Sequence, residues 1–93
     1  MRQAAEWDVA GFLGDEETMA EYLNAAIEEG DSADIAKALG DIARAKGMTK
    51  VAQETGFTRD GLYKALSDTG NPSISLVSKV LSSFGLKLRV AVG

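Results

Sequence analysis

Residues 59–64 carry side chains whose types and spacing suit contacts with nucleic acid. Arg59 and Tyr63 are four residues apart, so they share one face if the segment is helical, and Lys64 lies beside them. An arginine can donate two hydrogen bonds to a guanine edge, whereas lysine and tyrosine suit backbone phosphates. Asp60 fits less well, because a carboxylate repels phosphate unless it accepts from a cytosine amino group. The predicted chemistry is therefore recognition rather than catalysis.

Residues 48–66, which must position these side chains, have the pattern of two short helices joined by a tight turn. Ala52 is small enough for the helices to approach closely, and Gly56 can take the positive φ that ends the first helix. Phe57 fills the corner, and the Thr58 hydroxyl caps the second helix. The inward positions are predicted to be Val51, Leu62 and Leu66. The pattern favours a helix-turn-helix with its second helix in the major groove over a helical hairpin that only packs.

Ten polar residues form the predicted DNA-binding set. Residues of the motif are expected to meet base edges or phosphates. For Ser67, Asn71, Ser73 and Ser75 of the following loop, the favoured interpretation is that they only cap and turn the chain, and the alternative is that their hydroxyls and amides hold phosphates. Gly61 lowers helix propensity by about 1 kcal/mol, which is understandable if the helix backbone lies close to DNA. The set comprises Thr49, Lys50, Thr58, Arg59, Asp60, Tyr63, Lys64, Ser67, Asn71 and Ser73.

The composition excludes several classes of function. The chain has no Cys and no His, which removes the usual zinc sites, cysteine nucleophiles and histidine bases. We therefore predict no catalytic residue, no metal and no cofactor. The sequence has no run of about 18 apolar residues, so we predict no membrane span. The first twelve residues lack the pattern of a signal peptide. The absence of Cys fits a reducing compartment, so a cytoplasmic protein is expected.

Charge is divided unevenly along the 93 residues, whose formal net charge is −4. Residues 1–46 hold four basic and eleven acidic residues, a net charge of −7, whereas residues 47–93 hold six basic and three acidic ones, a net charge of +3. Affinity for phosphate comes largely from Lys and Arg, so the basic half is the one suited to DNA. The acidic half is suited to a basic partner.

The remaining periodicity predicts one small all-α domain over residues 1–93 with three further helices. Apolar residues at helical spacing indicate helices over 15–29, 31–46 and 73–84. The inward positions are expected to be Met19, Tyr22, Leu23, Ala26 and Ile27, then Ile35, Leu39, Ile42 and Ala43, then Leu76, Val77, Val80, Leu81 and Phe84. The acids at positions 15–17 are better explained by the dipole of a helix N-terminus than by a metal site. Trp7 is expected to pack on the surface as a lid rather than to bind a partner.

In the last residues of the chain, the apolar spacing changes from helical to alternating. Leu86, Leu88, Val90 and Val92 alternate with Lys87, Arg89 and Ala91, which is typical of a β-strand over residues 86–92. A lone strand needs a partner for its backbone groups, either from the same chain or from a second copy. Antiparallel self-pairing would give a two-fold dimer, which could read two half-sites about 34 Å apart. We favour this dimer over an intramolecular or frayed strand.

The chain resembles the addiction-module antidote proteins, a HigA-like branch of the Xre/Cro helix-turn-helix regulators. The resemblance covers nearly the whole chain, and its most specific pieces are ALGDIARAKGM, GLYKALS and GNPS. It implies a lambda-repressor-like domain of four to five helices. It also implies an antitoxin that neutralises a small basic toxin of the RelE/ParE type and represses its own operon as a homodimer on a palindromic operator. The alternatives are a protein-binding module without DNA activity and an orphan prophage-type regulator without a toxin.

Overall fold

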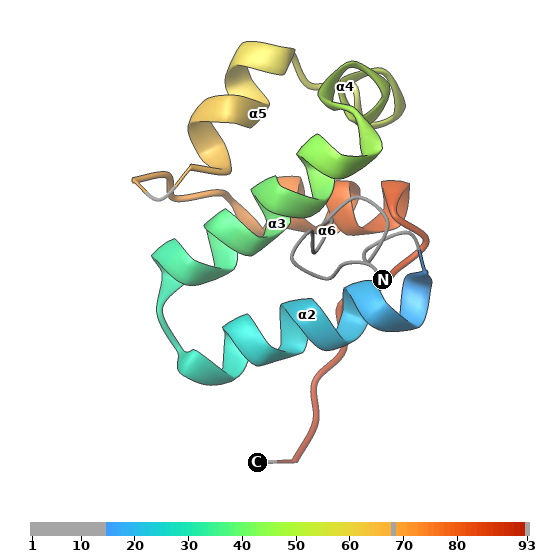
Figure 1. The fold of residues 1–93 in the computed structure, drawn as a ribbon. Helices are drawn as coiled ribbons and strands as arrows, with labels where there is room; N and C mark the ends of the chain where they lie inside the picture. The colour runs from blue at the N-terminus through green and yellow to red at the C-terminus, as the bar shows by residue number, and fades with distance from the viewer. Residues whose placement is uncertain (1–14, 68, 93) are drawn as a thin grey trace, which may run out of the picture.

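The structure, a computed structural model, describes residues 15–67 and 69–92, and these form five helices (Figure 1). The all-helical prediction is confirmed, while the lid predicted for Trp7 lies outside the described residues. None of the five helices has both the length and the apolar composition needed to cross a bilayer. The helices are α2 (Glu16–Glu29), α3 (Ser32–Lys46), α4 (Met48–Thr55), α5 (Arg59–Ala65) and α6 (Ile74–Ser83).

Short polar side chains cap the first turns of three of these five helices. The carboxylate of Asp31 accepts from the Ala33 N–H at 3.0 Å, and the hydroxyls of Thr58 and Ser73 accept from the third residue after each, also at 3.0 Å. Each of these bonds satisfies a backbone donor that has no partner within its helix. At the C-terminal end of α4, Gly56 has a φ of 84°, which is the left-handed backbone conformation that commonly ends a helix. The predicted caps at Thr58 and Ser73 and the predicted turn at Gly56 are confirmed.

The core lies where α3 and α4 meet the other helices. α3 packs against α2, α4 and α5, and α4 also packs against α6. The three positions predicted to point inward from the motif, Val51, Leu62 and Leu66, are each at most 1% exposed. Ile27 was predicted to join this core, but it is 48% exposed. The prediction was wrong because Ile27 lies near the end of α2 and borders an open groove.

Gly40 allows a close approach inside this core. It lies in the middle of α3, is buried, and has the backbone oxygen of Leu66 directly against it. A Cβ at this position would overlap that oxygen and would also come within 3.1 Å of Arg44 Nη1. Because the oxygen belongs to the backbone at the end of α5, it cannot rotate away. The absence of a side chain at Gly40 therefore decides how close α5 lies to α3.

One polar contact links α2 to α3. The Tyr22 hydroxyl donates to Asp41 Oδ2 at 2.6 Å, while Asp41 Oδ1 accepts from Arg44 at 2.8 Å. Lys37 lies 3.6 Å from the same carboxylate. Burial, and then the hydrogen bond to Asp41, raise the pKa of Tyr22 to about 12. Tyr22 therefore remains a neutral donor at physiological pH.

The strand predicted for residues 86–92 does not form in the single chain. After α6, the Leu86 N–H donates to the Leu81 carbonyl, and the residues beyond have no regular secondary structure. A strand needs a neighbour for its backbone donors and acceptors, and the described part of the same chain offers none. Figure 1 shows this segment leaving α6, passing α2 and ending away from the helices.

Candidate functional site

The turn between α4 and α5 holds the two helices at a fixed angle. Its first residue, Gly56, donates its N–H to the Ala52 carbonyl at 2.9 Å, and Phe57 packs against the core. The Thr55 hydroxyl donates to the Val51 carbonyl at 2.8 Å, which closes the end of α4. Phe57 thus occupies the corner as predicted. The two helices are held by both backbone and side-chain contacts, so α5 has a well-defined orientation.

α5 exposes the four polar side chains that the sequence singled out. Arg59, Asp60, Tyr63 and Lys64 all lie on the surface, and Tyr63 is 42% exposed. The Arg59 guanidinium carbon lies 5.8 Å from the centre of the Tyr63 ring, a distance that allows a cation–π interaction. Among the described residues no carboxylate forms an ion pair with Arg59. Tyr63 can therefore orient Arg59 without neutralising its charge.

α4 contributes two exposed residues, Thr49 and Lys50, from its first turn. α4 follows α3 with only Gly47 between them, and it has no side-chain cap. Both side chains can reach solvent, because the buried residues of α4 are Met48 and Val51 on its other side.

In the loop after α5, two of the three residues predicted to contact DNA form hydrogen bonds within the chain. Ser67 Oγ donates to the Lys64 carbonyl at 3.0 Å and lies 3.2 Å from Thr69 Oγ1, while Ser73 caps α6. The cap-and-turn interpretation is therefore confirmed for Ser67 and Ser73. Asn71 is exposed. A contact of these residues with phosphate stays a prediction. The Ser73 hydroxyl accepts in its cap and still has a proton to donate, whereas Ser67 would have to give up its bond to the Lys64 carbonyl.

Two residues near the turn were missed by the sequence reasoning. Lys79 of α6 places its ammonium 5.6 Å from the centre of the Phe57 ring, which brings a cation to the turn. Gly70 crosses the end of α5 so closely that a Cβ would lie 2.5 Å from the Lys64 carbonyl oxygen. Neither contact could be predicted from a local sequence pattern, because each joins the motif to a residue outside it.

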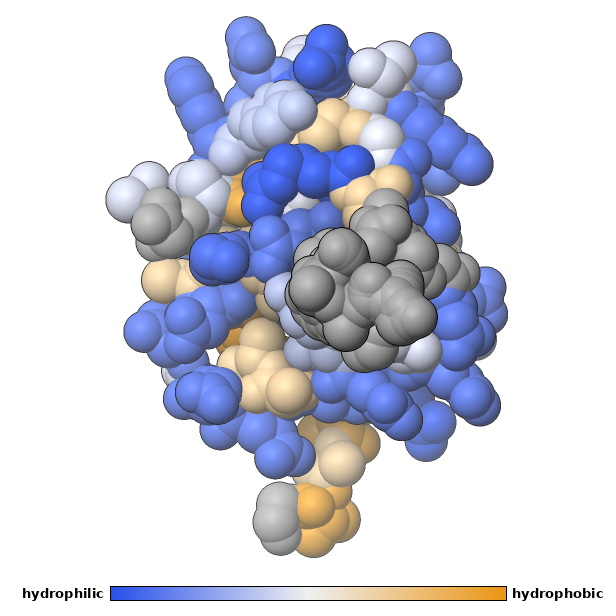
Figure 2. Space-filling view, in the orientation of Figure 1, coloured by the Kyte–Doolittle hydropathy of each residue, from blue (hydrophilic) through white to orange (hydrophobic). Residues whose placement is uncertain are grey.

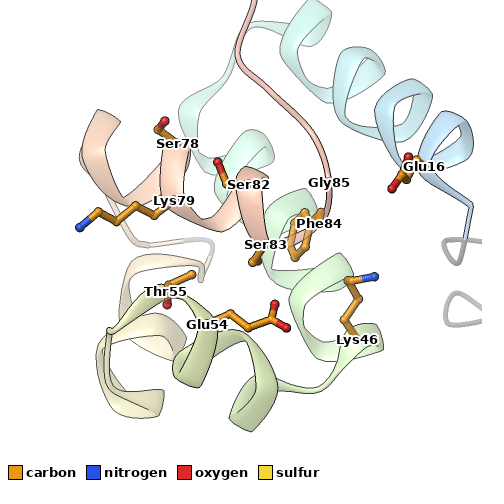
Figure 3. A pocket seen from close by; sticks show the side chains of 10 residues that line it. All are labelled: Glu16, Lys46, Glu54, Thr55, Ser78, Lys79, Ser82, Ser83, Phe84 and Gly85. Atoms are coloured by element: carbon orange, nitrogen blue, oxygen red, sulfur yellow. The ribbon is translucent and has the colours of Figure 1, made fainter.

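A broad hollow of about 790 Å³, lined by residues of α2, α3, α4 and α6, does not form a reactive site (Figure 3). Figure 3 shows Lys46 and Lys79 pointing to opposite sides of it, with Glu16 far from Glu54. The hollow also contains hydroxyls of α6, but among the described residues neither Glu16 nor Glu54 forms a hydrogen bond with one of them. Among the described residues no group of three acidic side chains could hold a metal ion. The exposed α4–α5 surface is thus the better candidate site.

Comparison with known proteins gives two matches. A family model described as "Probable addiction module antidote protein" matches residues 3–92. A protein of Haemophilus influenzae, described only as an uncharacterized protein, is 46% identical over 88 residues, which is 95% of this chain and 91% of that protein. No solved structure matches the chain.

Proposed function

The chain belongs to the family of probable addiction module antidote proteins, and we propose that it is an antitoxin that neutralises a toxin and represses its own operon by binding DNA. Antidotes act by binding and are not enzymes, which agrees with a chain that has neither His nor Cys. The observation that supports the DNA-binding part most strongly is the exposed, partly basic surface of α5, held by a capped turn.

In this proposal α4 and α5 act as a helix-turn-helix of the Xre/Cro type. α5 lies in the major groove, where Arg59 donates two hydrogen bonds to a guanine and Asp60 accepts from a cytosine amino group. Tyr63 beneath the guanidinium reduces the number of conformers that Arg59 loses on binding. Lys50 and Lys64 contact phosphates, together with the hydroxyl and amide groups of Thr49, Thr58, Ser67, Asn71 and Ser73.

The acidic helices form the surface proposed for the toxin. Seven acidic residues of α2, its connection to α3 and the first turn of α3 are exposed, whereas Asp41 is engaged by Tyr22 and Arg44. Such a surface attracts a small basic protein of the RelE/ParE type and increases the rate of encounter. The exposed acids are Glu16, Glu17, Glu21, Glu28, Glu29, Asp31 and Asp34.

A palindromic operator requires two copies of α5, so we propose a cytoplasmic homodimer joined through residues 86–92. Apart from the Leu86 N–H, which donates to the Leu81 carbonyl, these residues have no backbone hydrogen bond among the described parts of the chain, and a second copy can supply partners. The second candidate function, a toxin-binding protein without DNA activity, is favoured by the overall charge of −4. An orphan repressor that has no toxin would show the opposite pattern, with DNA binding alone.

The first test is a fluorescence-anisotropy titration with the DNA upstream of the gene, at two salt concentrations, with scrambled DNA as control. We expect about a thousandfold preference for the upstream DNA and, for roughly six phosphate contacts, a log–log salt slope near −5. Arg59→Ala should lose about 1–3 kcal/mol on the cognate DNA. Lys37→Ala removes a positive charge from α3, outside the proposed surface, and should bind as the parent does.

Equal binding of Arg59→Ala and the parent to both DNAs would exclude Arg59 as a base-reading residue. Absence of DNA binding by the parent would favour the toxin-binding function. The toxin is tested separately, by coexpression with the neighbouring gene product and calorimetric titration of the purified pair. Failure to bind that product, with DNA binding retained, would identify an orphan repressor.

A further inference from the structure

An apolar groove runs along the side of the molecule between α2, α3, α6 and the C-terminal residues. It encloses about 530 Å³, and its lining includes Leu23 and Ile27 of α2, Ile74 of α6, and Leu86 and Leu88 of the last segment. Ile27 is 48% exposed and Ile74 is 74% exposed. Large apolar side chains gathered in this way on the surface of a small domain are typical of an interface.

The C-terminal segment, which forms one wall of the groove, continues beyond the groove with its apolar side chains exposed. Val90 is 99% exposed and Val92 is 102% exposed, although both continue the apolar alternation that begins at Leu86 and Leu88. In Figure 2 the projecting end of the chain is orange, in contrast to the mainly blue helical body. In an extended segment every second side chain points to the same side, so Val90 and Val92 share the side of Leu88. An apolar surface that ends in an unpaired, strand-like segment favours a partner that is itself an extended segment with alternating apolar residues.

A second copy of residues 86–92 meets these requirements when it runs antiparallel. In an antiparallel pair, two residues that lie opposite each other point to the same face of the sheet. If the two-fold axis passes through a residue, odd positions lie opposite odd ones and even positions opposite even ones. Only then do the apolar residues of this alternating segment lie opposite each other. An axis at Arg89 would place two arginines opposite each other, which is unfavourable. An axis at Val90 places Arg89 opposite Ala91 and Leu88 opposite Val92, so no like charges face each other.

Charge is consistent with this register. Lys87 and Arg89 are exposed and line the groove of their own chain, and no described carboxylate pairs with either. With the axis at Val90, the Arg89 of each copy lies opposite Ala91 of the other, so the register does not place the two arginines opposite each other.

We propose that the C-terminal segments of two copies pair antiparallel with the two-fold axis at Val90, so that each Val92 lies beside the other copy's Leu88 and covers the mouth of its groove. This inference rests on the homodimer of the proposed function and names the surface that completes it.

Sedimentation of the full chain without DNA or toxin tests the groove. The parent should be a dimer, and Ile27→Asp should raise the dissociation constant by at least about tenfold, because it places a charge in an apolar contact. Val92→Asp should do the same, and its fully exposed position in the single chain leaves the fold intact. Ala25→Asp adds the same charge to an exposed position of α2 outside the groove and should dimerise as the parent does.

Cysteine substitution tests the register, since the parent has no Cys. Val90→Cys should form a disulfide-linked dimer on mild oxidation, and Ala91→Cys, which does not face its own copy, should not. A monomeric parent, or Ile27→Asp and Val92→Asp variants that dimerise normally, would overturn the proposal. Preferential linkage of Ala91→Cys would overturn the register. Because neither DNA nor toxin is present, failure here is distinct from failure of the antitoxin or repressor function.

Discussion

Replacing Gly40 by Ala tests whether the contact between α3 and α5 is as close as the structure shows. In an exposed helix this change would stabilise the protein by about 1 kcal/mol, because alanine is the better helix former. At Gly40 the new Cβ would overlap the Leu66 carbonyl oxygen and lie 3.4 Å from Leu66 Cβ. Overpacking of a core typically costs about 1–3 kcal/mol and more when backbone must move. We expect a net loss of about 2 kcal/mol.

The loss should appear in thermal unfolding followed by circular dichroism, as a fall in Tm of about 10 °C for a domain of this size. Gly61→Ala is the matched control, because it makes the same substitution in α5, where the nearest atom is the Thr58 hydroxyl at 3.0 Å. That hydroxyl caps α5 but is a side-chain atom, which can shift by a few tenths of an ångström and keep its bond to the residue 61 N–H, so the control should change stability by less than about 1 kcal/mol. A Gly40→Ala protein as stable as the parent would refute the close approach of α3 and α5.

Three further substitutions have defined outcomes. Thr58→Ala should cost about 1 kcal/mol in chemical denaturation by removing the α5 cap, and an equal loss in Thr58→Ser would contradict that reason. Leu62→Ala should cost about 2–5 kcal/mol, since Leu62 is fully buried; a loss below 1 kcal/mol would show that the site collapses. Tyr22→Phe should cost about 1 kcal/mol at neutral pH. Because the folded pKa of Tyr22 is raised to about 12 from 10, parent stability should fall from pH 10 towards pH 12 more steeply than that of the phenylalanine variant.

The helices could be predicted because their signals are local. Asp31, Thr58 and Ser73 are capping residues directly before apolar periodicity, and Gly56 follows the last turn of α4, so each boundary is set by neighbouring residues. The exposure of the α5 side chains followed from the same periodicity.

The errors and omissions concern contacts between distant parts of the chain. Ile27 has the helical spacing of a core residue, but whether it is covered depends on what lies above the end of α2. The roles of Gly40 and Lys79 depend on Leu66 and Phe57, which no local pattern connects to them. Residues 86–92 alternate as a strand would, but a strand also needs a neighbour, and the described chain does not provide one, so the predicted strand is absent there.

The polar link between α2 and α3 has a consequence for behaviour in salt. Among the described residues, the Tyr22–Asp41 bond alone joins side chains more than four residues apart, both ion pairs lie within α3, and no polar residue is buried. Local surface ion pairs contribute little to stability, and apolar packing is not weakened by screening. Unfolding should therefore be nearly independent of sodium chloride across the range that releases bound DNA. Dissociation in concentrated salt would leave a folded protein that binds again on dilution.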